Sequence, residues 1–477
     1  MGQKVKYMVS DSCNTLVVGG GLSGLALATF LKKENPDIDL LLLEAGKRPG
    51  GAIRSFDCDG FLAEWGAHGF LDNCAESREL LRISGLDAEI QKAPLGKFVR
   101  YICLGGRLRL IPQSPPKIIA SPIMPLTAKL RVLADLWKKP CSHEQSIAQW
   151  AGHRFGRGVL PFVDAALTGT SAGDMEKLSI DAVMPGLRKL ELEHGSVIRG
   201  LFRRQRKRKA VSGKKKGELP AMISFPGGME RLPRGLAAGL RQGGELLLNT
   251  GVSRIRRRER EWLVTSSAGE FRCRNLVLAL PVNSSLQLLK EDSLGLPAPP
   301  VDRLAETRIA TVVLGFTDET EIPFGFGYLA PEQEKRFCLG AMFSSHMFAG
   351  RAPAGHVLVE ALVGGRRHPE RLQLEDDPLV EAVMADLRQL LPIAGDPCFT
   401  RVLRQEAAFP QLEMGYPRLL AWRDRICADQ PGLHVCGFGW EGIGINDMVR
   451  QAKRIASAII AGDETHGREA EVKGVYF

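Results

Sequence analysis

The sequence predicts an α/β fold whose main domain is assembled from separated stretches of the chain. Near the N-terminus, an apolar, β-branched run at 15–18 leads into a glycine-rich turn at 19–24 and a run with helical pattern at 25–33. Near the C-terminus, an apolar run at 433–436, a glycine-rich turn and a helical run from about 446 to 461 repeat this order. Strand, turn and helix in this order predict a parallel sheet with helices on both faces.

The rest of the chain predicts two further parts. Its 477 residues suggest two or three domains at roughly 150 residues each. Strand-like runs between short polar turns at 245–280 predict a meander that returns to the main sheet. Helix formers punctuated by proline at 111–209 predict a helical subdomain, and strands alternating with a helix at 378–391 predict a mixed α+β domain. The predicted limits are 13–85 with 218–295 and 426–463 for the first domain, 86–110 with 296–425 for the α+β domain, and 111–217 for the helical subdomain.

The net charge of +10 is concentrated in one run, because ten Arg and Lys lie within 199–216. We predict a solvated, mobile loop there, with attraction to anionic lipid head groups as the alternative. Nucleic acid is not expected as a partner, because only Phe202 places an aromatic ring among these charges.

Cysteine and histidine spacing argues against several classes of site. The ten cysteines form no CxxC pair and no secretory leader precedes the first strand, so we expect reduced thiols and a cytoplasmic location. The nine histidines show no metal-binding spacing, so we expect no metal. No window of about 19 residues is apolar enough to span a bilayer.

The first glycine turn carries the pattern of a dinucleotide site. Gly19, Gly21 and Gly24 fit GxGxxG, in which missing side chains let backbone N–H groups reach a pyrophosphate and let the helix pack on the strand. Glu44 closes the next apolar run, 39–44, where its carboxylate can accept hydrogen bonds from ribose hydroxyls and would repel a 2′-phosphate.

The residues after Glu44 extend this pattern. The run EAGKRPGGAIRS, 44–55, places Gly50 and Gly51 between Arg48 and Arg54, which suits a second phosphate and a nearby ring. A surface turn with solvated arginines is the alternative. ExxxRxGG after GxGxxG resembles the superfamily of FAD-dependent amine oxidases, phytoene desaturases and protoporphyrinogen oxidases. The resemblance recurs at NTGVSRI, where the family places the backbone matching Val252 against adenine, and at FPGGMERLPRGLAAGL.

The C-terminal glycine turn predicts the flavin end of the cofactor site. Four glycines between 437 and 444 precede a helix that Asn446 or Asp447 is expected to cap. A helix N-terminus stabilises the negative charge of a reduced flavin, although an ordinary capped helix gives the same pattern. The predicted FAD-binding residues are Gly19, Gly21, Leu22, Ser23, Gly24, Glu44, Ala45, Arg48, Gly50, Gly51, Gly66, Ala67, Val252, Trp440, Asn446, Asp447 and Met448.

Five segments narrow the resemblance to the oxygen-dependent protoporphyrinogen oxidases. They are EWGAHGF at 64–70, LTGTSAGDMEKLSI at 167–180, FGFGYLAP at 324–331, LGAMFSS at 339–345 and WEGIGIND at 440–447. The resemblance implies a discontinuous Rossmann-like FAD domain of the amine oxidase type. Ala67 departs from the family pattern, which usually has proline there, and so does Ser171 with its neighbours in place of YAG or FAG.

The resemblance also implies the substrate-binding residues. Those matching Phe326 and Leu329 pack against opposite faces of a tetrapyrrole, backbone around Gly169 faces the ring, and His68 lies near a propionate. A flat apolar ring with carboxylates requires apolar walls and a donor or cation. Core packing for Phe326 and Leu329, and a structural hydrogen bond for His68, are the alternatives.

The implied reaction is the FAD-dependent oxidation of protoporphyrinogen IX to protoporphyrin IX in haem biosynthesis. Dioxygen would accept six electrons in total and hydrogen peroxide would be released, with no acid or base residue assigned. Alternatives are oxidation of coproporphyrinogen III, a flavin amine oxidase, whose lysine near flavin N5 we do not identify, and a flavin-binding scaffold. By resemblance, the apolar stretch 111–140 is expected to rest on the inner face of the cell membrane, with burial inside the protein as the alternative; a homodimer is left open.

Overall fold

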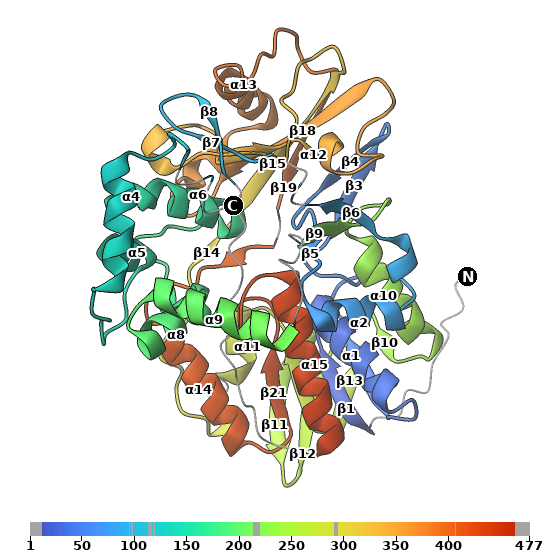
Figure 1. The fold of residues 1–477 in the computed structure, drawn as a ribbon. Helices are drawn as coiled ribbons and strands as arrows, with labels where there is room; N and C mark the ends of the chain where they lie inside the picture. Colours follow the sequence, from blue (N-terminus) through green and yellow to red (C-terminus); the bar gives the residue numbers. More distant parts are fainter. Residues whose placement is uncertain are drawn as a thin grey trace.

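Two seven-stranded sheets, one above the other in Figure 1, organise the molecule. The computed structural model describes residues 12–462 except 95, 97–98, 113–116, 118–119, 213–219, 291–293 and 406. Helices cover the sheets and fill the side between them, so the predicted α/β class with a mixed α+β part and a helical part is confirmed.

The first sheet joins strands from both ends of the chain. Its strands run in the order β10 (Leu246–Leu247), β2 (Leu40–Leu43), β1 (Ser12–Val18), β13 (Gly269–Ala279), β12 (Glu261–Ser266) and β11 (Val252–Arg258), with β21 (Leu433–Cys436) paired to β13. β10, β2, β1, β13 and β21 are parallel, whereas β11 and β12 add the predicted antiparallel meander.

Helices bury both faces of this sheet. One face packs on α1 (Leu22–Glu34), α2 (Ala75–Ile83), α10 (Arg231–Gln242) and α15 (Ile445–Ala461), and the other on α11 (Val282–Leu289) and α14 (Tyr416–Asp429). Successive residues of β1 alternate between these two cores, with Val17 in the first and Leu16 and Val18 in the second. Burial on both faces explains the continuous apolar runs in the sequence.

The carboxyl ends of the parallel strands meet at one edge. Val18 pairs with Leu43 and Leu278, and β21 ends beside Ala279. The glycine turns after β1 and β21 therefore emerge side by side. Ligands of open α/β sheets bind at this edge.

The second sheet is mainly antiparallel and has its own core. Its order is β19 (Phe399–Arg404), β15 (Ile309–Thr317), β18 (His356–Gly364), β17 (Gly340–Met342), β16 (Gly327–Leu329), β7 (Tyr101–Cys103) and β8 (Leu108–Leu110). α13 (Asp376–Leu387) packs on one face through Leu379, Val383 and Leu387.

The shorter elements are β3 (Ser55–Cys58), β4 (Phe61–Glu64), β5 (Phe70–Leu71), β6 (Gln91–Pro94), β9 (Ala221–Ser224), β14 (Glu306–Thr307), β20 (Phe409–Pro410), α12 (Ser344–Met347) and five 3-10 turns, η1 (Asp87–Glu89), η2 (Ala134–Leu136), η3 (Arg157–Val159), η5 (Glu332–Glu334) and η6 (Pro369–Gln373).

The helical part corrects one prediction. It contains α4 (Leu126–Leu133), α5 (Ile147–Phe155), α6 (Leu160–Ser171), α7 (Ile180–Val183), α8 (Pro185–His194) and α9 (Val197–Ser212). The basic run was predicted to be a mobile loop, but as far as Ser212 it is helix α9, because Arg, Lys and Gln favour helices. The buried Asp135 carboxylate fixes the start of α9 by accepting hydrogen bonds from Ser196 Oγ at 2.6 Å and Ile198 N at 2.9 Å. The rest of the run, 213–216, lies outside the described residues.

Candidate functional site

A chamber of 2040 Å³ opens between the two sheets, lined by both of them and by the helical part. Ligand sites usually enclose about 300–1,000 Å³, so this chamber has room for a cofactor and a substrate together. We call the side formed by the glycine turns the cofactor end, and the side formed by α6, β16 and β7 the substrate end.

The first glycine turn is shaped by close backbone contacts. A Cβ on Gly24 would collide with the carbonyl oxygen of Gly19, so α1 lies against the turn without a side chain between them. Gly19 has φ +111°, a conformation that favours glycine. At Gly21 a Cβ would meet nothing within 4 Å, because this residue faces the open chamber.

Donors at the start of α1 fit a phosphate group. Gly21 is the N-cap of α1 and provides no side-chain cap, so the first N–H groups of this helix remain available for an anion. Ser23 lines the chamber, and its Oγ is buried without a hydrogen-bond partner among the described residues. An orphaned hydroxyl beside free helix donors is the chemistry that a dinucleotide pyrophosphate satisfies.

Glu44 stands at the end of β2, on the chamber wall. Its Oε2 accepts a hydrogen bond from Gly20 N at 2.7 Å and its Oε1 accepts one from Gly46 N at 2.7 Å. Each carboxylate oxygen has a further lone pair for a ribose hydroxyl. The residues present therefore fit the adenosine part of FAD.

Some predicted cofactor residues do not line the chamber but lie behind its wall. Arg48 does not line the chamber; it donates to the carbonyl oxygens of Gly51 at 2.9 Å and of Pro49 and Ile53 at 3.3 Å, and so holds the turn around Gly50. Gly24, Ala45, Val252 and Trp440 also lie outside the lining. Trp440 is fully buried in the core, with Nε1 3.4 Å from Ser285 Oγ.

The helix cap at the flavin end differs from the prediction. Gly444, rather than Asn446 or Asp447, is the N-cap of α15. Asp447 Oδ2 accepts a hydrogen bond from Gly444 N at 3.3 Å, while Asn446 Nδ2 donates to Leu71 O at 2.9 Å. Asn446 therefore anchors the helix start to β5, and Asp447 places a negative charge in the first turn.

The chamber brings together most of the predicted residues. Its lining includes Gly19, Gly21, Leu22, Ser23, Glu44, Gly50, Gly51, Gly66, Ala67, Asn446, Asp447 and Met448 from the cofactor set, and His68, Gly169, Phe326 and Leu329 from the substrate set.

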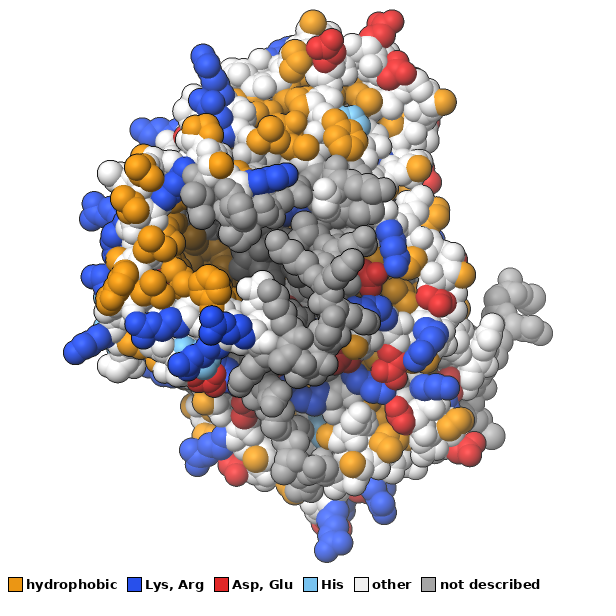
Figure 2. Space-filling view, viewed as in Figure 1, with side chains coloured by type: hydrophobic (Ala, Val, Ile, Leu, Met, Phe, Trp, Pro, Cys, Tyr) orange, Lys and Arg blue, Asp and Glu red, His pale blue; other side chains and the backbone are white. Residues whose placement is uncertain are grey.

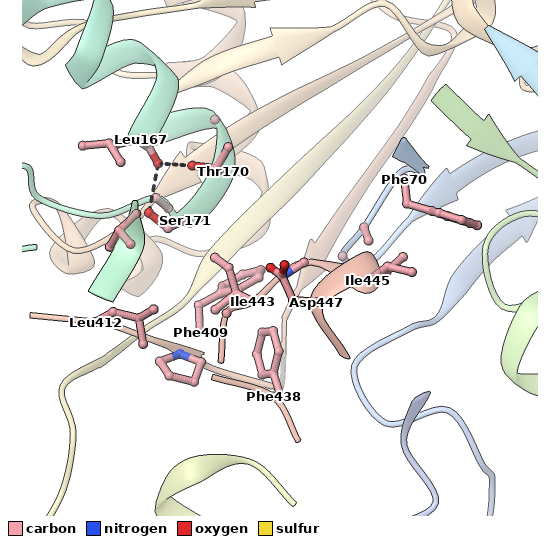
Figure 3. A pocket seen from close by; sticks show the side chains of 18 of the residues that line it. Phe70, Leu167, Thr170, Ser171, Phe409, Leu412, Phe438, Ile443, Ile445 and Asp447 are labelled. Atoms are coloured by element: carbon pink, nitrogen blue, oxygen red, sulfur yellow. Dashed lines mark hydrogen bonds between the residues drawn. The ribbon is translucent and has the colours of Figure 1, made fainter. Parts of the chain in front are cut away.

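Apolar side chains also line the chamber between its two ends. Figure 3 shows Phe409, Phe438 and Ile443 gathered on one side, opposite the end of α6. The hydroxyls of Thr170 and Ser171 donate to Leu167 O at 3.3 Å and 3.0 Å, so they are satisfied within their own helix. Gly169 allows α6 to approach β16, since a Cβ there would lie 2.8 Å from Leu329 Cδ1.

Arg100 is a lining residue that the sequence prediction missed. It precedes β7, and its guanidinium carbon lies 5.3 Å from the centre of the Phe326 ring. Partial burial lowers the pKa of Arg100 to about 10, so the guanidinium is charged at neutral pH. Among the described residues, no carboxylate contributes to that pKa. A partly buried cation beside an aromatic ring suits a carboxylate on a flat ligand.

His68 lies on the wall between the two ends and has an acidic partner inside the protein. Its Nε2 is 2.9 Å from Oε2 of Glu360, a fully buried residue of β18. Burial opposes protonation of His68, but the carboxylates of Glu360 and Glu64 outweigh it and raise the pKa of His68. The predicted partner of His68 was a substrate propionate, whereas the carboxylate found beside it belongs to the chain.

Comparison with known proteins gives consistent matches over nearly the full length. Residues 22–460 match the family described as flavin containing amine oxidoreductase. The chain is 30% identical to a mitochondrial protoporphyrinogen oxidase of Nicotiana tabacum, over 95% of each chain. It is 28% identical to a coproporphyrinogen III oxidase of Staphylococcus aureus, over 93% of this chain and 98% of the relative.

Solved structures share the fold. A crystal structure from Exiguobacterium sp. 255-15, provisionally named a protoporphyrinogen oxidase, matches with a TM-score of 0.76 and 22% identity, covering 96% of this chain and all of the other. Reduced UDP-galactopyranose mutase matches with a TM-score of 0.70 and 15% identity, over 95% of each chain.

Proposed function

We propose that this chain, which belongs to the family of flavin-containing amine oxidoreductases, oxidises protoporphyrinogen IX to protoporphyrin IX. Dioxygen would accept the electrons and leave as hydrogen peroxide, and the product would feed haem biosynthesis. The relatives named protoporphyrinogen oxidase and coproporphyrinogen III oxidase support a porphyrinogen substrate.

Membership of the family also bears on the cofactor. The predicted FAD cofactor and the predicted oxidoreductase activity are confirmed. The pyrophosphate and ribose contacts assigned to Ser23 and Glu44 remain proposals about how this chain holds FAD.

The observation that carries the substrate proposal is Arg100 beside Phe326 in an apolar wall. Protoporphyrinogen IX has its two propionates on neighbouring pyrroles, so one edge of the ring is acidic and the rest is apolar. We propose that this edge meets Arg100 while Phe326 and Leu329 pack on the ring faces. Coproporphyrinogen III carries two more propionates, which would be buried at a cost wherever they met the apolar side chains around Phe326 and Leu329.

The protein's share of the chemistry is positioning. A bound FAD would supply the hydride acceptor for each of the three oxidations. Arg100 and the apolar walls orient the macrocycle and exclude water, and α15 directs its N-terminal N–H groups toward the chamber. No protein base is assigned, since pyrrole N–H protons can pass to solvent as the ring tautomerises.

A fluorescence assay tests the proposal. Purified holoprotein is mixed in air with protoporphyrinogen IX or coproporphyrinogen III, and porphyrin fluorescence is followed against enzyme-free controls. We expect a kcat/KM at least tenfold higher for protoporphyrinogen IX. The reverse ratio would assign coproporphyrinogen III, and no acceleration with either substrate would refute the porphyrinogen proposal in favour of an amine oxidase or a flavin-binding scaffold.

We also propose that the helical part, 111–217, rests on the cytoplasmic face of a membrane. Leu126, Leu130, Leu133 and Trp137 are 69, 59, 48 and 75% exposed. Their spacing places them on one face of α4 and the turn after it. Apolar side chains gather on this side of the molecule in Figure 2, with Arg and Lys at the rim. Ile118 and Ile119 of the predicted membrane segment lie outside the described residues.

Such a surface suits peripheral attachment to anionic lipid, in which apolar side chains enter the interface beside a basic rim. In the described part of the chain, no helix is long and apolar enough to cross a membrane.

Vesicle sedimentation tests this attachment. We expect wild-type protein to sediment with phosphatidylglycerol vesicles, and a Leu126→Glu, Leu130→Glu, Trp137→Glu variant to stay in the supernatant. Leu374→Glu, at an exposed leucine of the second sheet region, is the matched control. Binding that survives the triple variant would contradict the proposal, and a dimer in gel filtration that the same variant dissociates would assign this face to a second copy of the chain.

A further inference from the structure

A buried ionic cluster lies behind the chamber wall at His68. Oε2 of Glu360 accepts hydrogen bonds from His68 Nε2 at 2.9 Å and from Glu64 N at 3.3 Å, and its Oε1 accepts one from Ser344 Oγ. An oxygen pair that receives three donors is an ionised carboxylate. Glu360 thus places a full negative charge in the interior of the second sheet.

Arg351, the other cation of the cluster, forms its ion pair with Glu64 rather than with Glu360. Arg351 Nη1 lies 2.6 Å from Glu64 Oε1, and its Nη2 donates to Ser224 Oγ at 2.6 Å. Glu64 also accepts hydrogen bonds from Ser55 Oγ at 2.6 Å and Met229 N at 2.9 Å. Burial raises the pKa of Glu64, whereas Arg351 and these donors favour its ionised form. With both carboxylates ionised, one guanidinium leaves one negative charge, which a protonated His68 neutralises.

The charge on His68 faces the ligands. Its side chain is 13% exposed and lines the chamber, whereas Glu360 is fully buried. Within the described part of the chain, Nδ1 of His68 has no protein hydrogen-bond partner. Gly66 and Ala67, which directly precede His68 in the chain, also line the chamber, as does Met342, which pairs with Glu360 in the sheet.

We propose that Glu360 holds His68 as an imidazolium on the chamber wall, where its charge stabilises the reduced flavin. A hydride brings two electrons and one proton, so a neutral oxidised flavin gains one negative charge on each turnover. The start of α15 supplies only the partial positive charge of a helix N-terminus, because Asp447 in its first turn forms an ion pair with Arg450 at 3.6 Å. His68 supplies the missing positive charge without giving up a proton, and Glu360 is a positioning residue.

The pH dependence follows from the groups around His68. Glu360 from β18 and Glu64 from β4 raise the pKa of His68, while Arg351 opposes them. Below that pKa the cation is present, and above it the charge is lost. Flavin reduction should therefore become less favourable as pH rises through this pKa, beyond the change that uptake of the flavin's own proton causes.

The test measures the flavin rather than turnover. The inference rests on the FAD site of the proposed function, but not on the porphyrinogen. Holoprotein is reduced anaerobically with dithionite or xanthine oxidase beside a reference dye, and the two-electron reduction constant is determined from pH 5.5 to 9. We expect His68→Gln to lower this constant at least tenfold at pH 6.5, about 30 mV for a two-electron couple, and to remove the additional pH dependence.

A graded series separates charge from damage to the fold. His68→Gln leaves Glu360 unpaired, whereas His68→Gln with Glu360→Gln removes both charges and keeps the side-chain shapes. The double variant should fall between wild type and His68→Gln, because it loses the positive end of the dyad without gaining a bare carboxylate. Arg107→Gln, which removes an exposed cation of the β7–β8 hairpin, is the control and should leave the reduction constant unchanged.

A second measurement uses the wild-type protein. In 15N-histidine-labelled holoprotein, the His68 ring should titrate above the ordinary histidine pKa of about 6.5. In Glu360→Gln the midpoint of this titration should move to lower pH. A His68 pKa at or below 6.5, or a reduction constant equal to wild type in both His68 variants, would overturn the proposal. A changed KM for porphyrinogens with an unchanged reduction constant would also overturn it, by assigning His68 to a substrate carboxylate.

Discussion

The two ends of the chamber are built on different principles. At the cofactor end, backbone N–H groups, glycines and a single carboxylate at the ends of parallel strands form the wall. At the substrate end, side chains from α6, β16 and the residue before β7 form it, and Arg100 there is a partly buried cation whose pKa no carboxylate of the described residues affects. Backbone geometry recognises what every dinucleotide shares, whereas side chains select one substrate.

The largest effect is expected from Gly24→Ala at the cofactor end. The added Cβ would collide with Gly19 O, and moving α1 away would spoil the phosphate turn. We expect most of the FAD to be lost from purified protein, measured by absorbance at 450 nm. The control is Gly239→Ala within α10, where a Cβ meets nothing within 4 Å; this change should keep FAD and stabilise the fold by up to about 1 kcal/mol.

Gly169→Leu should break the substrate end alone. The new side chain would press on Leu329 and fill the space for the macrocycle. Porphyrin formation should fall at least a hundredfold while FAD content stays at the wild-type value. Gly152→Leu on α5, where a Cβ has no neighbour within 4 Å, controls for a larger residue on a helix of the same part. Loss of FAD in Gly169→Leu, but not in the control, would show that the two ends are not separate sites.

Arg100→Gln tests the cation of the substrate end. A hydrogen bond to a charged group contributes about 1.5–3 kcal/mol, so kcat/KM for protoporphyrinogen IX should fall roughly 10- to 150-fold. Most of the change should appear in KM if Arg100 binds substrate and transition state equally. Arg107→Gln, at an exposed position of the β7–β8 hairpin, should behave as wild type. Equal kinetics for the two variants would remove Arg100 from the site.

The smallest effect concerns stability at the junction of the two ends. The folded-state pKa of His68 is raised by Glu360, so its stabilising effect is complete below the unfolded value of about 6.5 and is lost as pH rises through the folded value. We expect the urea midpoint to decline across that range in wild type. The decline should be absent in the His68→Gln, Glu360→Gln double variant, and an identical pH profile in both proteins would contradict the assignment.

The difference between the two ends also explains what the sequence could predict. The glycines between β1 and α1 are required by the local geometry of that turn. The turn, and Glu44 at the end of β2, could therefore be located from the sequence alone. The same holds for the elements of the first sheet, whose continuous apolar runs report burial on two faces.

The substrate end depends on contacts between distant segments. Arg100 lies beside Phe326 only because β7 pairs with β16, with Tyr101 opposite Tyr328. A lone arginine between Val99 and Tyr101 gives no sign of this. Glu360 did leave a signal, as an acid inside the apolar strand HVLVEALVG, and a search for charged residues within apolar strands would have found it.

Electron transfer from a porphyrinogen to FAD in this chamber can be measured without oxygen. Holoprotein is mixed anaerobically with one equivalent of protoporphyrinogen IX, and flavin absorbance at 450 nm is followed by stopped flow, with putrescine as the comparison substrate. We expect rapid bleaching by the porphyrinogen and none by the amine. A flavin that stays oxidised with porphyrinogen, or that the amine bleaches instead, would contradict this electron transfer.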